Sequence, residues 1–263
     1  MGITDIKKYA VHEVIHHLQE VKDDETLIRM GLCTYGAKTN GMALNEAAVQ
    51  IISSYVLSTT PEQVKYYGIN LTTISPDFYP LQCNLMSQMC YLIGENIMYD
   101  STFFSNDTFK NQLIKYIGKK NYTTIELGFE EMLDCEEQLV IIANKLSDPS
   151  CDEKDSKKYA NLVKTYKDRI KRTFFHVQNS IFVPYFETKY TQLQTDNDIQ
   201  TFKRNLSVYK ELIGTSDDYN AFNDYYMSIL RKIDLEYENI VKTSLVTHKE
   251  NRFINLIKKL LHR

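Results

Sequence analysis

Residues 4–23 read TDIKKYAVHEVIHHLQEVKD, a stretch without proline or glycine at whose start Thr4 or Asp5 can cap a helix. Its apolar side chains recur at steps of three and four residues, which is the spacing of a helix. These side chains are Ile6, Tyr9, Ala10, Val14 and Leu18. The pattern predicts one uninterrupted helix over about 4–23, and within it residues 12–16 read H-E-V-I-H.

The H-E-x-x-H pattern has a specific geometry when it lies on a helix. Residues four apart are one turn from each other, so the imidazoles of His12 and His16 can reach one zinc ion at about 2.0–2.1 Å each. Glu13 points roughly 100° around the helix from His12. It therefore lies beside the open coordination position, where a carboxylate can take a proton from zinc-bound water. We predict that His12 and His16 are metal ligands and that Glu13 is the general base.

A catalytic zinc ion usually has three protein ligands, and a second predicted helix supplies a candidate. This helix starts near Met42 and carries ALNEAAVQIISSYVLS at 43–58, with one apolar face. Glu46 lies near its start, in the segment L-N-E-A. The competing ligands are Glu20, Asp23, Asp24 and Cys33.

His12, Glu13, His16, Asn45 and Glu46 together resemble the gluzincin metallopeptidases. In that family a glutamate on the helix after the H-E-x-x-H helix completes the zinc site, often within a short N-E-A or N-E-G segment. The stretch that begins MGLC and ends GMALNEAAVQ is also similar to uncharacterised bacterial metallopeptidase-like families, and we expect the similarity to reach about residue 118. The resemblance implies a zinc-dependent hydrolase that cleaves peptide bonds in a peptide or protein, with Glu46 as the third ligand.

The resemblance further implies a group that stabilises the oxyanion of the tetrahedral intermediate, which gluzincins supply from a downstream tyrosine or histidine. The candidates here are Tyr66, Tyr67 and Tyr79. Other polar side chains near the ligands can orient them. The candidates for this role are His17, Asn45 and Gln50, and an ordinary place on a helix surface is the alternative for each.

The rest of the chain predicts a mainly α fold with little or no β-sheet. A zincin-like helical domain is expected over 1–146, a linker or long loop over 147–158, and a helical hairpin or three-helix bundle over 159–263. Seven of the nine glycines lie at or before Gly118, which marks the change to long helices. Residues 69–80 are expected to be extended, and Pro184 and Gly214 are expected to separate helices. The expected helices cover 61–68, 81–98, 107–117, 124–146, 156–183, 185–213 and 217–246.

Composition excludes several classes of protein. The formal net charge of −3 does not favour nucleic acid, which calls for a basic domain or stripe. There is no run of 18 apolar residues, so no transmembrane segment is expected, and the first twenty residues lack the apolar core of a signal peptide. The five cysteines have no C-x-x-C spacing and are interpreted as free thiols. We therefore expect a cytoplasmic protein.

One departure from the family separates two hypotheses. A β-sheet lobe precedes the metal-binding helix in gluzincins, whereas eleven residues precede His12 here. Either the chain is part of a longer peptidase, or it is a reduced scaffold that binds metal without a substrate cleft. The alternative to a peptidase is a helical interaction protein with a degenerate or structural metal site, whose C-terminal helices contact a protein partner. The basic amphipathic stretch over 250–263 either packs on the bundle or contacts a membrane or partner.

Overall fold

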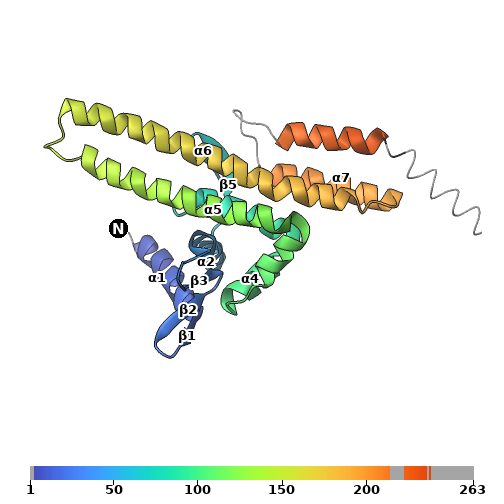
Figure 1. Cartoon of the computed structure of the whole chain (residues 1–263), viewed down its shortest axis with the longest axis horizontal. Coiled ribbons are helices and arrows are strands. Elements are labelled where there is room, and N and C mark those ends of the chain that lie inside the picture. Colours follow the sequence, from blue (N-terminus) through green and yellow to red (C-terminus); the bar gives the residue numbers. More distant parts are fainter. Residues whose placement is uncertain (1–2, 214–221, 236, 238–263) are drawn as a thin grey trace, which may run out of the picture.

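The computed structural model describes residues 3–213, 222–235 and 237. Over these residues the predicted mainly α fold is confirmed, and two small antiparallel sheets accompany the helices. The long helices α5 and α6 lie side by side, and the elements of the predicted site lie beneath α5 in Figure 1. The helices are α1 (Ile3–Leu18), α2 (Met42–Val56), α3 (Pro80–Ile93), α4 (Glu95–Phe103), α5 (Thr108–Leu146), α6 (Glu153–Tyr190), α7 (Asp196–Ile213) and one more over 222–235. The strands are β1 (Glu20–Asp23), β2 (Thr26–Met30), β3 (Cys33–Thr34), β4 (Glu62–Tyr66) and β5 (Ile69–Thr73). Across the part of the chain that the structure describes, no helix has the length and apolar content needed to cross a membrane.

The first helix ends earlier than the sequence predicts. α1 stops at Leu18, and residues 20–34 form a three-stranded antiparallel sheet in the order β1-β2-β3 instead of continuing the helix to 23. Asp23 pairs with Thr26 across a two-residue turn in which Asp24 has a φ of 51°. Aspartate tolerates this left-handed conformation better than most residues do. The sheet therefore begins directly after the helix that carries the two histidines.

The short helix predicted over 61–68 is wrong, because these residues form β4 and a hairpin turn. β4 pairs with β5 in a regular antiparallel register that closes on Tyr66 and Ile69. The two turn residues, Tyr67 and Gly68, have φ values of 48° and 80°. Two consecutive positive φ values are typical of a type I′ turn, whose twist matches that of a hairpin. The extended conformation predicted for 69–80 is confirmed over β5.

α5 and α6 form an antiparallel hairpin joined by a turn at 147–152, within the segment predicted to be a linker. The side chain of Asp152 caps α6 by accepting the backbone N–H of Asp155 at 2.7 Å. The gap predicted between the helices 107–117 and 124–146 is a single residue. Gly118 has non-helical angles (φ 79°, ψ 156°) inside α5, and the helix resumes directly after it.

The helix break predicted at Pro184 is wrong. α6 continues through this proline to Tyr190 before the chain turns into α7. A proline inside a helix costs about 3 kcal/mol. Ile181, Phe182 and Phe186 around it are fully buried, and burial of each such side chain contributes roughly 1.5–3 kcal/mol. The packing of this segment therefore outweighs the lost backbone hydrogen bond.

Four further predictions concern the remaining helical segments and breaks. The helix predicted over 81–98 is divided into α3 and α4 at Gly94, whose φ is 106°. The helix predicted over 217–246 is observed for 222–235, and most of its remaining residues are not among those described. The break at Gly214 and the amphipathic stretch over 250–263 lie outside the described residues.

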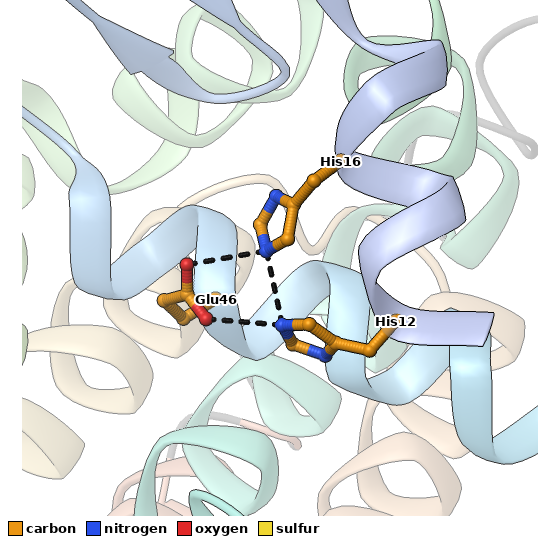
Figure 2. Close-up of side chains that lie close together, drawn as sticks. All are labelled: His12, His16 and Glu46. Atoms are coloured by element: carbon orange, nitrogen blue, oxygen red, sulfur yellow. Dashed lines mark hydrogen bonds and ion pairs between the residues drawn. The ribbon is translucent and has the colours of Figure 1, made fainter. Parts of the chain in front are cut away.

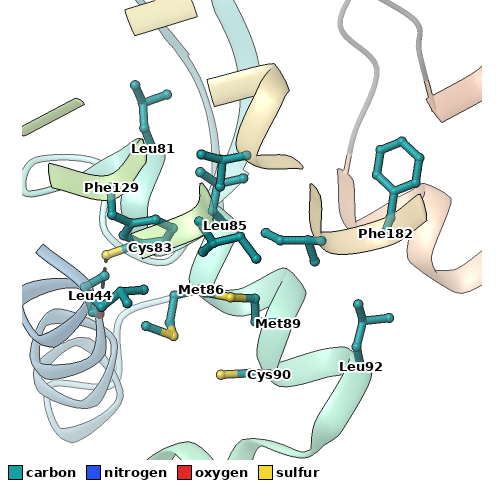
Figure 3. Close-up of a cluster of buried hydrophobic side chains, with 14 of the residues drawn as sticks. Leu44, Leu81, Cys83, Leu85, Met86, Met89, Cys90, Leu92, Phe129 and Phe182 are labelled. Atoms are coloured by element: carbon teal, nitrogen blue, oxygen red, sulfur yellow. Dashed lines mark hydrogen bonds between the residues drawn. The ribbon is translucent and has the colours of Figure 1, made fainter. Parts of the chain in front are cut away.

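α3 lies at the centre of the hydrophobic core. Figure 3 shows its side chains between Leu44 of α2, Phe129 of α5 and Phe182 of α6, all of which are buried. Phe222 extends the same cluster, since its ring lies 4.9 Å from that of Phe182 and 5.4 Å from that of Tyr209. Continuous packing from α2 to the helix over 222–235 gives the site helices a fixed support.

Candidate metal centre

His12, His16 and Glu46 converge on one point between α1 and α2. Figure 2 shows both imidazoles projecting from α1 toward the carboxylate of Glu46 on α2. The Nε2 atoms of the two histidines are 2.9 Å apart. Each lies 3.2 Å from an oxygen of Glu46: His12 from Oε2 and His16 from Oε1. Within the described residues, this is the one group of at least three His, Cys, Asp or Glu side chains whose ligand atoms come this close.

The electrostatics of this cluster favour a positive charge at its centre. Burial acts to raise the pKa of Glu46, but hydrogen bonds and charge from His12 and His16 lower it to about 2. Burial acts to lower the pKa of His16, and Glu46 reverses this and raises it. Two bare imidazole nitrogens at 2.9 Å would repel each other. A bound proton or a metal ion removes that repulsion, and the side chains are only 12–19% exposed to solvent.

The spacing of the three atoms fits a small tetrahedral ion. With metal–ligand bonds of about 2.0–2.1 Å, separations of 2.9 and 3.2 Å correspond to angles of roughly 90–103° at the metal. The ideal tetrahedral angle is about 109°, and zinc sites with two histidines and one glutamate are a standard combination. The donor set therefore fits zinc with little adjustment, and all three ligands line the cleft described below.

α2 presents Glu46 from a helix whose start is held by another element. The backbone N–H of Ala43 donates to Oε1 of Glu130 on α5 at 3.1 Å, which satisfies one of the free amides in the first turn of α2. Leu44, Ala47 and Ala48 anchor the opposite face in the core. Glu46 is thus only partly buried, on the face of α2 that meets α1.

The outer nitrogens of both histidines also have partners. Nδ1 of His12 lies 3.0 Å from Oε1 of Gln50, whose Nε2 is 3.5 Å from Oγ of Ser54. Nδ1 of His16 lies 3.5 Å from Nδ2 of Asn45. Gln50 and Asn45, two of the candidates for orienting the ligands, thus contact the two histidines. His17 is largely exposed, and its Nδ1 lies 3.3 Å from Oε1 of Glu20.

A cleft of about 480 Å³ opens beside the three ligands. Glu13 is exposed and lines it together with both histidines. Glu20 and Met30 bring the first sheet to its wall. The full lining is Tyr9, His12, Glu13, His16, His17, Glu20, Met30, Glu46, Gln50, Phe78 and Tyr79.

Of the three tyrosines proposed as oxyanion stabilisers, Tyr79 lies at this cleft. Its ring centroid is 6.5 Å from that of His12, and it lines the cleft together with Glu46. Burial first, and then the charge of Glu46, raise the pKa of its hydroxyl, which therefore stays protonated and able to donate. Tyr66 and Tyr67 lie elsewhere, at the β4–β5 turn, with ring centroids 4.2 Å apart.

The competing ligands lie apart from the cluster. Glu20 lines the cleft but pairs with Lys22 at 2.6 Å, and Asp23 and Asp24 lie at the tip of the β1–β2 hairpin. Cys33 is fully buried, and burial raises the pKa of its thiol. The sequence did not single out Gln19, which is buried beside His16. Its position three residues after His16, one helical turn away, is the signal that could have identified it.

We compared the chain with protein-family models, with curated proteins and with solved structures, and none of the three comparisons gives a match. The interpretation of the site therefore depends on its own residues and their geometry.

Proposed function

We propose that this chain is a zinc-dependent metallopeptidase of the gluzincin type, with a zincin-like arrangement of α1 and α2 at its centre. The observation that carries the proposal is the convergence of His12, His16 and Glu46 at the wall of a cleft that Glu13 also lines. His12, His16 and Glu46 would hold the zinc ion, which when bound would polarise a scissile carbonyl and lower the pKa of a coordinated water to about 7.

The residues of the cleft have distinct roles in this proposal. Glu13 accepts a proton from the attacking water and delivers it to the leaving amine. Tyr79 would donate a hydrogen bond from its hydroxyl to the oxyanion, and its raised pKa keeps that hydroxyl protonated. Its backbone φ of 51° is unusual for a residue that is not glycine, and Pro80 follows directly at the start of α3.

The first sheet offers a surface for an extended peptide. β1 is an edge strand of the order β1-β2-β3, and all four of its residues are exposed. Glu20 at its start lines the cleft. A peptide that adds to such an edge gains backbone hydrogen bonds whatever its sequence. This sheet follows the metal-binding helix in the chain, where the family resemblance implies one before it.

The test separates metal binding from catalysis. Purified protein should hold about one equivalent of zinc, and His12→Ala or Glu46→Ala should lose it. His17→Ala is the matched control and should keep the metal, because this histidine is 81% exposed and faces Glu20. Glu13→Gln should retain zinc and lose hydrolysis of a peptide library.

Each failure has its own meaning. Absence of zinc in protein purified without chelators rejects the site. Zinc binding that is unaffected by Glu46→Ala rejects the ligand assignment. Zinc binding with no hydrolysis that depends on Glu13 rejects the peptidase and favours the alternative, a helical interaction protein with a structural metal site.

A further inference from the structure

The two residues that bring the first sheet to the cleft lie directly opposite each other. Glu20 on β1 pairs with Met30 on β2 in the antiparallel register. The side chains of such a pair project from the same face of a sheet, with their Cβ atoms about 4.5–5.5 Å apart. Both residues line the cleft beside the metal ligands. One face of this sheet therefore presents a thioether and a carboxylate to the cleft, next to each other.

The carboxylate of Glu20 already contacts two nitrogen atoms. Its Oε2 lies 2.6 Å from Nζ of Lys22, and its Oε1 lies 3.3 Å from Nδ1 of His17. The hydrogen bond from Lys22, followed by that from His17, lowers the pKa of Glu20, so this group carries a negative charge at neutral pH. The side chain of Lys22 is half exposed, and an ion pair at a protein surface contributes little. A cation that enters the cleft can therefore replace Lys22 with little loss.

The charge of the cleft favours the same kind of ligand. Its lining includes the carboxylates of Glu13, Glu20 and Glu46, and of the residues that the structure describes, no lysine or arginine lines it. With neutral histidines, the two positive charges of a zinc ion leave this lining negative. An acidic side chain is therefore repelled from the cleft, whereas a basic one is attracted.

We propose that Glu20 and Met30 form a subsite that selects a lysine or arginine side chain of the peptide substrate. Met30 packs against the methylene groups, and Glu20 binds the ammonium or guanidinium group at their end. A long side chain with a charged end fits this pair, because an apolar and an anionic group face each other across the two strands. The inference rests on the proposed peptidase and names its substrate class.

Binding of peptides to the chain tests the subsite without requiring hydrolysis. The probes are fluorescent alanine-rich peptides in which one position at a time carries Lys, norleucine or Glu, and anisotropy gives their dissociation constants. At one position, Lys should bind more tightly than norleucine by about twofold to fivefold, the range for an ion pair at a surface. Glu should bind more weakly than norleucine there. A higher salt concentration should reduce both differences.

Two variants should change this preference in opposite directions. Glu20→Gln removes the negative charge and should abolish the advantage of Lys over norleucine. Lys22→Met removes the competing cation and should increase that advantage. Glu25→Gln is the matched control, because Glu25 is exposed in the turn of the β1–β2 hairpin and the substitution removes the same charge. It should leave the preference unchanged.

The outcomes separate this inference from the proposed function. Equal dissociation constants for Lys and norleucine at every position overturn the subsite, and so does a preference that survives Glu20→Gln. An equal loss in Glu25→Gln also overturns it, because the preference then reflects net charge alone. Hydrolysis of these peptides by the wild type tests the proposed peptidase by itself. A preference for Lys that depends on Glu20, without hydrolysis, supports the subsite and rejects the enzyme.

Discussion

Gly31→Ala tests how tightly the first sheet closes on the metal centre. A Cβ atom at Gly31 would lie 2.2 Å from Oδ1 of Asn45 and 2.8 Å from Nε2 of Gln19. Nδ2 of Asn45 lies 3.5 Å from Nδ1 of His16 and donates to Oε1 of Gln19, and both amide side chains are buried. The backbone φ of +57° adds a second cost, because L-residues disfavour this region by roughly 1–2 kcal/mol.

Gly68→Ala provides a matched control for the conformational part. Gly68 also has a positive φ (+80°), but nothing lies within 4 Å of its added Cβ. Both variants change the entropy of the unfolded chain equally, so this effect cancels in the comparison. We expect Gly68→Ala to lower the free energy of unfolding by about 1–2 kcal/mol. Gly31→Ala should lower it by about 1–3 kcal/mol more than Gly68→Ala does, because of overpacking.

Urea denaturation of the two variants and the wild type measures these differences. Gly31→Ala should also weaken zinc binding, since the added Cβ would displace Asn45, which contacts His16, whereas Gly68→Ala should leave it unchanged. Equal stability of the two variants would refute the close approach at Gly31. Unchanged zinc affinity in a clearly destabilised Gly31→Ala protein would refute the link between this glycine and the metal centre.

Two further predictions concern the partly buried polar side chains of Glu136 and Ser105. Burial raises the pKa of Glu136 to about 7, although a hydrogen bond from Gln82 acts to lower it. The folded state therefore binds the proton of this carboxyl more tightly than the unfolded state does. The resulting contribution to stability is present below about pH 4.5 and is lost as pH rises through 7. From pH 5 to pH 8, the free energy of unfolding of Glu136→Gln should therefore rise by on the order of 2–3 kcal/mol relative to that of the wild type. Urea denaturation at both pH values measures this difference, and parallel pH dependences of the two proteins would contradict it. Ser105→Ala leaves the backbone N–H of Gly31 without its partner and should destabilise the protein by about 1–3 kcal/mol. Ser147 is exposed, and the stability of Ser147→Ala should stay within about 0.5 kcal/mol of that of the wild type. Equal thermal stability of the two variants would count against this role of Ser105.

The helices that carry the ligands could be predicted because their signals are local. Spacing of four residues places His12 and His16 on one helix face, and the apolar periodicity of 43–58 predicts the helix that carries Glu46. Their meeting depends on the packing of α1 on α2, which the sequence pattern alone does not fix. The positions of the amide side chains around the histidines depend on the same packing, so the sequence pattern did not single out Gln19.

The errors of prediction arose where short-range signals competed. Residues 61–68 have a proline start typical of a helix, but Val64 and Tyr66 alternate in burial, and Tyr67-Gly68 forms a hairpin turn. Pro184 predicted a break that burial of the surrounding aromatic side chains overrode. The end of α1 at Leu18 was missed because the strand residues after it are also polar and lack glycine or proline.

The position of the metal is the central claim, and diffraction at the zinc absorption edge tests it most directly. Crystals of the protein purified without chelators should give one anomalous difference peak between α1 and α2. We predict that it lies about 2.0–2.2 Å from Nε2 of His12, Nε2 of His16 and a carboxylate oxygen of Glu46. A map without a peak there, or with zinc bound only at other side chains, would contradict the account.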